Sequence, residues 1–209
     1  MLSFLTILFA LTLIYLSIAE RFRSFSKLIA VQGFLLFGIA FLELTEINTA
    51  NLIFIVSETI IFKAIIVPMI LYQIINRIKI YKVHTKALPG FYSLLFTIVG
   101  LFLSIVLANS LVDEYTDTVY MTIALFALFT GLLIIVTHKL LFSHMIGFLV
   151  IENAVFMFSL AAGKEMPMLI NIGILLDIFA SVLILGIFIY KIGSQHRDLM
   201  ADNLTSLKH

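Results

Sequence analysis

Apolar residues fall into seven blocks along the chain, separated by short polar stretches. The blocks are 2–19, 27–45, 52–75, 91–112, 119–137, 140–162 and 167–190, each 18 to 24 residues long. At 1.5 Å per residue, a helix of this length crosses a hydrocarbon core about 30 Å thick. No block shows the polar–apolar alternation that is typical of membrane barrel strands. The pattern predicts an all-α integral membrane protein with seven transmembrane helices.

Charges between the blocks indicate how the chain crosses the membrane. Eleven of the thirteen lysine and arginine residues fall on one side: Arg21, Arg23, Lys27, Arg77, Lys79, Lys82, Lys86, Lys139, Lys191, Arg197 and Lys208. The opposite segments carry Glu43, Glu46, Asp113, Glu114, Asp117 and Glu165, with Lys164 as their cation. Cytoplasmic loops carry an excess of lysine and arginine. We therefore expect the amino terminus outside and the carboxyl terminus in the cytoplasm.

The composition narrows the possible functions. Hydrophobic residues make up 62% of the 209 residues and charged residues 12%, about half the charge of soluble domains. We expect one membrane domain over 1–209, with a polar cytoplasmic tail at 193–209. The chain has no cysteine and a formal charge of +1, which argues against iron–sulfur ligation and against a nucleic-acid partner.

The two ends of the chain show an internal similarity. Ser26-Lys27-Leu28 begins the second block and Ser143-His144-Met145 begins the sixth, 117 positions later. Glu58 in the third block and Asp177 in the seventh differ by 119. Because the two sets of helices also share an orientation, we expect a parallel 3+1+3 repeat. Its parts are 1–76 and 119–192, with 91–112 as the spacer.

Four ionisable residues lie inside the blocks: Glu58, Lys63, Glu152 and Asp177. A charge at the bilayer centre costs about 2.5–3.5 kcal/mol on insertion scales, so such residues usually have a partner or a function. Lys63 and Glu152 fall near the centres of their blocks, Asp177 close to its centre, and Glu58 further toward the outside. We predict that these residues form a proton or ion path. The alternative is that they are hydrogen-bonded struts between helices.

Glu58 and Lys63 are five residues apart, which places them about 140° apart around an α-helix. The spacing predicts that they do not pair. We expect Lys63 to meet an acid on another helix, a water-filled cavity or a neighbouring subunit.

A secondary polar path is predicted around the same layer. Gln32 lies in the second block, Asn153 follows Glu152, and His138 and His144 lie at the cytoplasmic boundary. Histidines at such positions can pass protons, although they also occur there as simple interfacial residues. The sequence shows no catalytic, metal-ligand or cofactor-binding pattern. Gly38, Gly131, Gly147 and Gly173 are expected to permit close helix approach.

The stretch Met145-Ile146-Gly147-Phe148-Leu149-Val150-Ile151-Glu152-Asn153-Ala154 resembles the second helix of subunit K of NADH–quinone oxidoreductase (complex I). Ile146-Gly147 and Asn153-Ala154 keep that subunit's spacing. Its glutamate position is Leu149 here, with Glu152 three residues later on nearly the same face. Asp177, followed by Ala180 and Ser181, resembles the acid of that subunit's third helix, displaced by about two residues.

By length and layout, the whole chain resembles the hydrogenase-4 component E family, found in formate hydrogenlyase-type membrane-bound [NiFe] hydrogenases. The resemblance implies a noncatalytic subunit in the plasma (inner) membrane of a prokaryote. It would contribute buried charges to proton or sodium translocation coupled to electron transfer. The implied partners are antiporter-like and quinone-site-like membrane subunits and a cytoplasmic hydrogenase or dehydrogenase arm. The nickel–iron centre and the iron–sulfur clusters would belong to those partners.

Three other functions stay open, of which one is a stand-alone small transporter built on the repeat. The chain is also similar to the small three-helix component of multisubunit cation/proton antiporters, which is related to subunit K. A seven-helix receptor or photoreceptor fits the helix count. A retinal protein, however, needs a lysine in the last helix for its Schiff base, and that helix carries Asp177 here.

Overall fold

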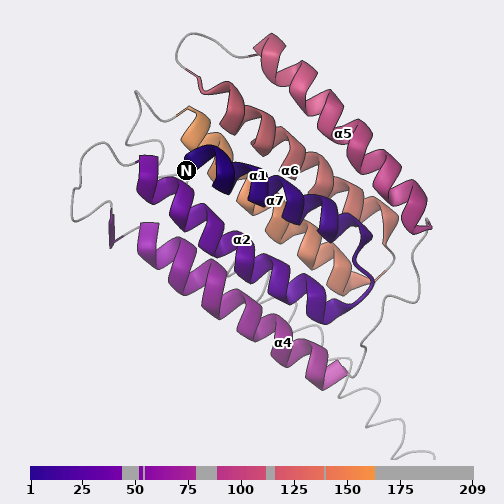
Figure 1. Ribbon diagram of the computed structural model, residues 1–209. Helices are drawn as coiled ribbons and strands as arrows, with labels where there is room; N and C mark the ends of the chain where they lie inside the picture. The colour runs from indigo at the N-terminus through magenta and orange to yellow at the C-terminus, as the bar shows by residue number, and fades with distance from the viewer. Residues whose placement is uncertain (44–51, 54, 79–88, 112–115, 139, 163–209) are drawn as a thin grey trace, which may run out of the picture.

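The computed structural model describes residues 1–43, 52–53, 55–78, 89–111, 116–138 and 140–162. These residues form a helical bundle without strands (Figure 1). The helices are α1 (Leu2–Ile18), α2 (Phe22–Glu43), η1 (Val56–Ile66), α4 (Val67–Ile78), α5 (Gly90–Leu111), α6 (Thr118–Thr137) and α7 (Leu141–Ala161).

The helix lengths confirm the membrane prediction in its coarse form. Five described helical segments are long and apolar enough to span a membrane: Phe22–Glu43, Val56–Asn76, Gly90–Leu111, Thr118–Thr137 and Phe142–Ala161. The apolar helix α1 is slightly shorter, at 17 residues. The seventh block, 167–190, and the tail, 193–209, lie outside the described residues. The helix count of seven and the repeat therefore stay predictions.

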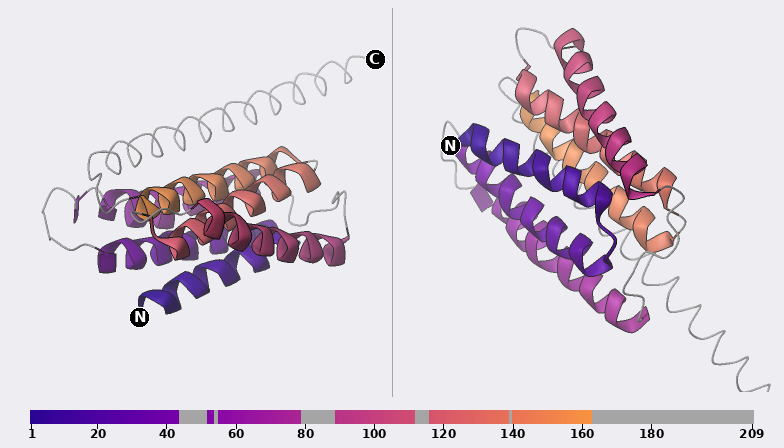
Figure 2. Two further views of the ribbon diagram at one scale, coloured as in Figure 1. Left: turned by 90° about the horizontal axis from the view of Figure 1, so that it is seen from above. Right: turned by 45° about the vertical axis from the view of Figure 1, so that its right-hand side comes forward.

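The helices lie alongside one another in the bundle (Figures 1 and 2). α6 and α7 form the most extensive contact, and α7 also packs on α2. α2 in turn contacts α1 on one side and η1 and α4 on the other, while α5 lies at the edge against α6 and α1. This order places α2 between α1 and the helix that carries Glu58 and Lys63.

The two ends of the bundle differ in charge. At one end, the Phe22 and Phe142 rings are 4.7 Å apart, so the turn before α2 lies beside the turn between α6 and α7. Arg23 Nη2 donates there to Asn76 Oδ1 at 3.5 Å. At the other end, the Tyr120 hydroxyl donates to Glu43 Oε2 at 2.9 Å. Arg23 thus lies at one end of the described bundle and Glu43 at the other.

Two glycines permit a close approach of α6 and α7. A Cβ added to Gly131 would lie 2.8 Å from the Gly147 carbonyl oxygen, and one added to Gly147 would lie 2.8 Å from the Gly131 oxygen. The predicted close approach of these two helices is confirmed. At Gly38, an added Cβ would meet Leu5 Cδ1 at 3.0 Å. Gly173 lies outside the described part of the chain.

α2 begins at Phe22, five residues before the start of the apolar block. The polar residues of its first two turns are helical because the backbone hydrogen bonds of a helix continue beyond the hydrocarbon core. Ser26 Oγ, in this segment, donates to the Pro68 carbonyl oxygen at 3.0 Å. That bond ties α2 to α4 near the basic end.

Candidate functional site: an intramembrane charge cluster

The segment that carries Glu58 and Lys63 is a π-helix, not the α-helix that the sequence predicts. It runs from Val56 to Ile66, and the Val67 N–H continues its pattern by donating to the Phe62 carbonyl, five residues earlier. Pro68 follows and has no N–H to donate. The carbonyl groups of Lys63 and Ala64, five and four residues earlier, therefore receive no hydrogen bond from position 68. The change from π to α hydrogen bonding occurs at this proline.

The π-helix brings Glu58 and Lys63 together. Hydrogen bonds between residues five apart place side chains five apart on the same face. Lys63 Nζ lies 3.5 Å from Glu58 Oε1. The prediction that these residues cannot pair is wrong, because it assumed the 100° step of an α-helix. Lys63 meets a carboxylate on its own helix.

Lys63 also faces α7. Its Nζ lies 5.2 Å from the centroid of the Phe156 ring, within the range of a cation–π interaction. Phe156 is four residues after Glu152, so both project from nearby faces of α7 one turn apart. Glu58, Lys63 and Glu152 are 0%, 4% and 6% exposed. Three ionisable side chains from two helices are thus buried in the same region.

Two amides on α2 and α7 extend the polar region. Asn153 Nδ2 donates to Gln32 Oε1 at 3.0 Å, and Gln32 Nε2 donates to Thr12 Oγ1 at 3.0 Å. The two bonds join α7, α2 and α1. Gln32 and Asn153 are both buried. We call Glu58, Lys63, Glu152, Asn153 and Gln32 the charge cluster.

Gly33 allows α2 to reach this cluster. A Cβ added there would lie 2.7 Å from the Ala64 nitrogen and 2.9 Å from the Lys63 carbonyl carbon. The backbones of α2 and η1 therefore meet beside Lys63. Any larger side chain at position 33 would push the two helices apart.

The two histidines lie away from the cluster. His138 is buried at the turn after α6, where its Nδ1 lies 3.0 Å from the Ile134 carbonyl oxygen and 3.0 Å from Thr137 Oγ1. His144 is half-buried in the first turn of α7. It precedes Glu152 by eight residues, about 12 Å along a helix axis. A proton path between them needs intermediate groups such as water. Asp177, the remaining predicted acid, lies outside the described residues.

Sequence reasoning missed three contributors to the site: Thr12, Gly33 and Phe156. Thr12 is one of four serine and threonine residues in α1, and Gly33 directly follows the buried Gln32. Phe156 is one helical turn from Glu152. Each had a signal in its spacing from, or position beside, a predicted site residue. Only the packing of four helices (α1, α2, η1 and α7) joins them to Lys63 and Asn153.

The charges of the cluster define its chemistry. It contains two carboxylates and one ammonium group, so full ionisation leaves one negative charge in a low-dielectric region. Among the described residues, no group of three or more histidine, aspartate and glutamate side chains is arranged to hold a metal ion.

No protein-family model matches the chain, and no curated protein or solved structure matches it either. The fold and the cluster therefore rest on the chain's own residues.

Proposed function

We propose that this protein is a noncatalytic subunit of a complex I-like or membrane-bound [NiFe] hydrogenase complex. In it, the charge cluster takes part in proton or sodium translocation coupled to electron transfer. The observation that carries the proposal is the burial of Glu58, Lys63 and Glu152 inside the described bundle, with Lys63 beside Phe156 of α7. Intramembrane charges that face a bundle interior commonly mark ion pathways.

The cluster suits transient loading by a proton. Lys63 neutralises one carboxylate, and the second is neutral when protonated and anionic when it releases the proton. The three ionisable groups of the cluster therefore sum to zero charge when Glu152 is protonated and to −1 when it is ionised. Gln32 and Asn153 contribute oriented dipoles beside it but no titratable group.

The position of Lys63 supplies a route for coupling. Its ammonium group contacts Glu58 on η1 and the Phe156 ring on α7. A shift of η1 relative to α7 would change the distance between this charge and Glu152, and with it the affinity of Glu152 for a proton. π-helical segments occur frequently at functional sites, which agrees with a role for η1 in this step.

Electron transfer would belong to partner subunits, because the chain has no cysteine to hold clusters. The proposed partners are antiporter-like and quinone-site-like membrane subunits and a cytoplasmic arm with the nickel–iron centre and iron–sulfur clusters. Asp177 would continue the ion route from the seventh helix.

The test is proton uptake by inverted membrane vesicles that contain the assembled complex. Glu152→Gln preserves shape and hydrogen bonding, so we expect assembly and electron transfer to persist while proton uptake per electron falls. Glu152→Asp should be milder, and Asp177→Asn tests the seventh helix in the same way. Glu20→Gln is the matched control, because Glu20 is an exposed acid in the turn before α2. Normal proton uptake with Glu152→Gln would assign that residue a structural role only.

Identifying the proteins that co-purify from mildly solubilised membranes tests the choice of complex. A hydrogenase or dehydrogenase large subunit would support the proposal. Antiporter proteins alone would favour the alternative function, that of the small component of a multisubunit cation/proton antiporter. A protein that is monomeric under all such conditions would contradict both.

A further inference from the structure

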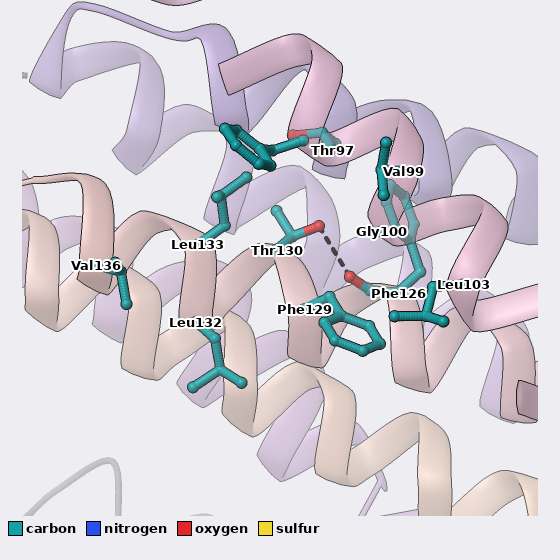
Figure 3. Close-up of a pocket in the computed structure, with 11 residues that line it drawn as sticks. Thr97, Val99, Gly100, Leu103, Phe126, Phe129, Thr130, Leu132, Leu133 and Val136 are labelled. Carbon is teal, nitrogen blue, oxygen red and sulfur yellow. Dashed lines mark hydrogen bonds between the residues drawn. The ribbon is translucent and has the colours of Figure 1, made fainter. Parts of the chain in front are cut away.

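Aromatic rings occupy two different environments in the described bundle. In the apolar groove between α5 and α6, Phe126 and Phe129 lie among threonine and aliphatic side chains (Figure 3). None of the described residues that line this groove is charged, and the Thr130 hydroxyl donates to the Phe126 carbonyl oxygen at 2.8 Å. The ring of Phe156 on α7 differs, because its centroid lies 5.2 Å from Lys63 Nζ. This ring contacts a buried charge.

Both sides of the contact between Phe156 and Lys63 are shielded from solvent. Phe156 is 3% exposed and Lys63 is 4% exposed. A cation over an aromatic face gains most when it is desolvated. The contact also joins two helices, since Lys63 belongs to η1 and Phe156 to α7. α7 therefore acts on the lysine charge through a ring.

The two neighbours of Lys63 act differently on its proton. Glu58 Oε1 lies 3.5 Å from Lys63 Nζ. Burial disfavours both charges of such a pair, and transfer of one proton from Nζ to the carboxylate would give a neutral amine and a neutral acid. Phe156 has no group that accepts this proton. Because its ring face attracts the ammonium and not the amine, Phe156 selectively stabilises the charged state of the pair.

Phe156 also determines where that charge lies relative to Glu152. The two residues are four positions apart in α7, which is about 6 Å along the helix axis and on nearly the same face. Glu152 is buried as well. A nearby positive charge favours the ionised form of a carboxylate, and buried charges are screened less than exposed ones. The Lys63 ammonium over this ring therefore favours ionised Glu152.

Other charged groups on the helices around the contact lie toward the helix ends. Arg23 and Lys27 of α2 are exposed. Glu43 of α2 accepts a hydrogen bond from Tyr120 of α6 at the acidic end. Arg77 of α4 follows Lys63 by fourteen residues, about 21 Å along a helix axis. His144 of α7 precedes Glu152 by about 12 Å. Within the described chain, Glu58 and Lys63 are thus the charges nearest to Phe156 apart from Glu152.

We propose that Phe156 is a positioning residue of the charge cluster. Its ring face holds the Lys63 ammonium group in its charged form beside α7 and thereby favours the ionised form of Glu152. The inference deepens the proposed function and rests on it, because Glu152 is the group that loads and releases a proton there. Movement of the ring away from the ammonium raises the affinity of Glu152 for a proton, although Phe156 itself does not titrate.

The ring can be weakened as a cation partner with little change of shape. Phe156 is replaced by phenylalanine analogues with one, two and three ring fluorines, each of which withdraws electron density from the ring face. The readout is the pH titration of the Glu152 carboxylic acid C=O band in the infrared spectrum. The sample is the full-length protein in phosphatidylcholine vesicles, and the band is assigned by its loss in Glu152→Gln.

Phe148 supplies the matched control. It lies on the same helix, four residues from Glu152 in the opposite direction, and is 46% exposed. The same three analogues at position 148 change the fluorine content and the hydrophobicity of α7 equally. We expect them to leave the Glu152 titration unchanged.

We expect the midpoint of the Glu152 titration to rise with each fluorine added at position 156. With three fluorines the rise should be about 0.5–1 pH unit, an increase in proton affinity of about three- to tenfold. Phe156→Leu should raise the midpoint at least as far, because leucine has no ring face. The fluorinated series carries the test if Phe156→Leu does not fold.

An unchanged midpoint across the series at position 156 would overturn the proposal and leave Phe156 as a packing residue. A falling midpoint would overturn it too, because the ring would then hold Lys63 away from Glu152. A Glu152 band that titrates in none of the proteins would have the same consequence.

Proton uptake by the assembled complex separates this proposal from the proposed function. A midpoint that shifts with fluorination, together with normal uptake in Glu152→Gln, would retain the role of Phe156 and reject the translocation role of Glu152. An unchanged midpoint together with reduced uptake in Glu152→Gln would reject the role of Phe156 and support translocation.

Discussion

Lys63 Nζ lies 3.5 Å from Glu58 Oε1, five residues earlier in the same π-helix. The central positive charge of this helix therefore has its counter-ion within its own turn. A lysine at mid-bilayer is about 15 Å from water on either side of a core about 30 Å thick. A partner on the same helix offsets part of that burial cost. Phe156 then contributes a second contact from α7.

The Glu58–Lys63 pair should dominate the stability of this helix. Glu58→Gln leaves the Lys63 ammonium buried with a weaker partner, and we expect it to lower the free energy of unfolding by about 3–5 kcal/mol. Lys63→Met should lower the free energy of unfolding by a similar amount, because it leaves the Glu58 carboxylate buried without the Lys63 ammonium group. The double variant Glu58→Gln/Lys63→Met should recover at least half of the loss. Unfolding in mixed micelles measures all three.

Glu152→Gln provides the comparison for that cycle. We expect the coupling free energy between Glu152→Gln and Lys63→Met to be smaller than that between Glu58→Gln and Lys63→Met. A stronger coupling to Glu152 would assign Lys63 to the acid on α7 rather than to the acid on its own helix. Gln73→Met is the control for a general effect of substitution. Gln73 is an exposed polar residue of α4, which directly follows η1.

Gly33→Ala should separate α2 from η1. The added Cβ would lie 2.7 Å from the Ala64 backbone nitrogen, and backbone atoms cannot move aside as a flexible side chain can. We expect a loss of about 1–3 kcal/mol in the free energy of unfolding. Gly100→Ala is the matched control, since its nearest neighbour would be at 3.6 Å. Equal losses for the two variants would contradict the close approach at Gly33.

The amide bonds should contribute less than the ion pair. Asn153→Leu removes one hydrogen bond and Gln32→Leu removes two. Interhelical hydrogen bonds in a membrane are worth about 0.6 kcal/mol on average and up to about 1.7. We therefore expect Gln32→Leu to cost about twice as much as Asn153→Leu. Thr12→Val removes one interhelical bond, from Gln32, and one bond within α1, to the Phe9 carbonyl oxygen. It should therefore cost no more than Gln32→Leu, as chemical unfolding would show.

The orientation can be tested by single-cysteine labelling, because the chain has no cysteine of its own. We expect Asp113→Cys to react with an impermeant maleimide from outside intact cells. Lys191→Cys should react only after the membrane is opened. Labelling of Asp113→Cys exclusively after opening would refute the predicted topology and remove the basis for the repeat.

Six of the seven apolar blocks are helices in the described chain, and this part of the fold follows from the sequence. The reason is that helix formation in lipid is a local requirement. Every backbone N–H and C=O must find a partner within the segment, so a long apolar block forms a helix. The close approach at Gly131 and Gly147 and the burial of Lys63 and Glu152 were predictable for related reasons of size and charge.

The pairing of Lys63 was decided by the tertiary structure. α and π hydrogen bonding both satisfy the backbone, so residue order alone does not select between them over Val56–Ile66. In the folded bundle, the π register joins Lys63 to Glu58 and directs its ammonium group toward Phe156. The Gln32–Asn153 bond likewise joins residues 121 positions apart. Such contacts depend on which helix faces become neighbours, and that is set by the packing of the whole bundle.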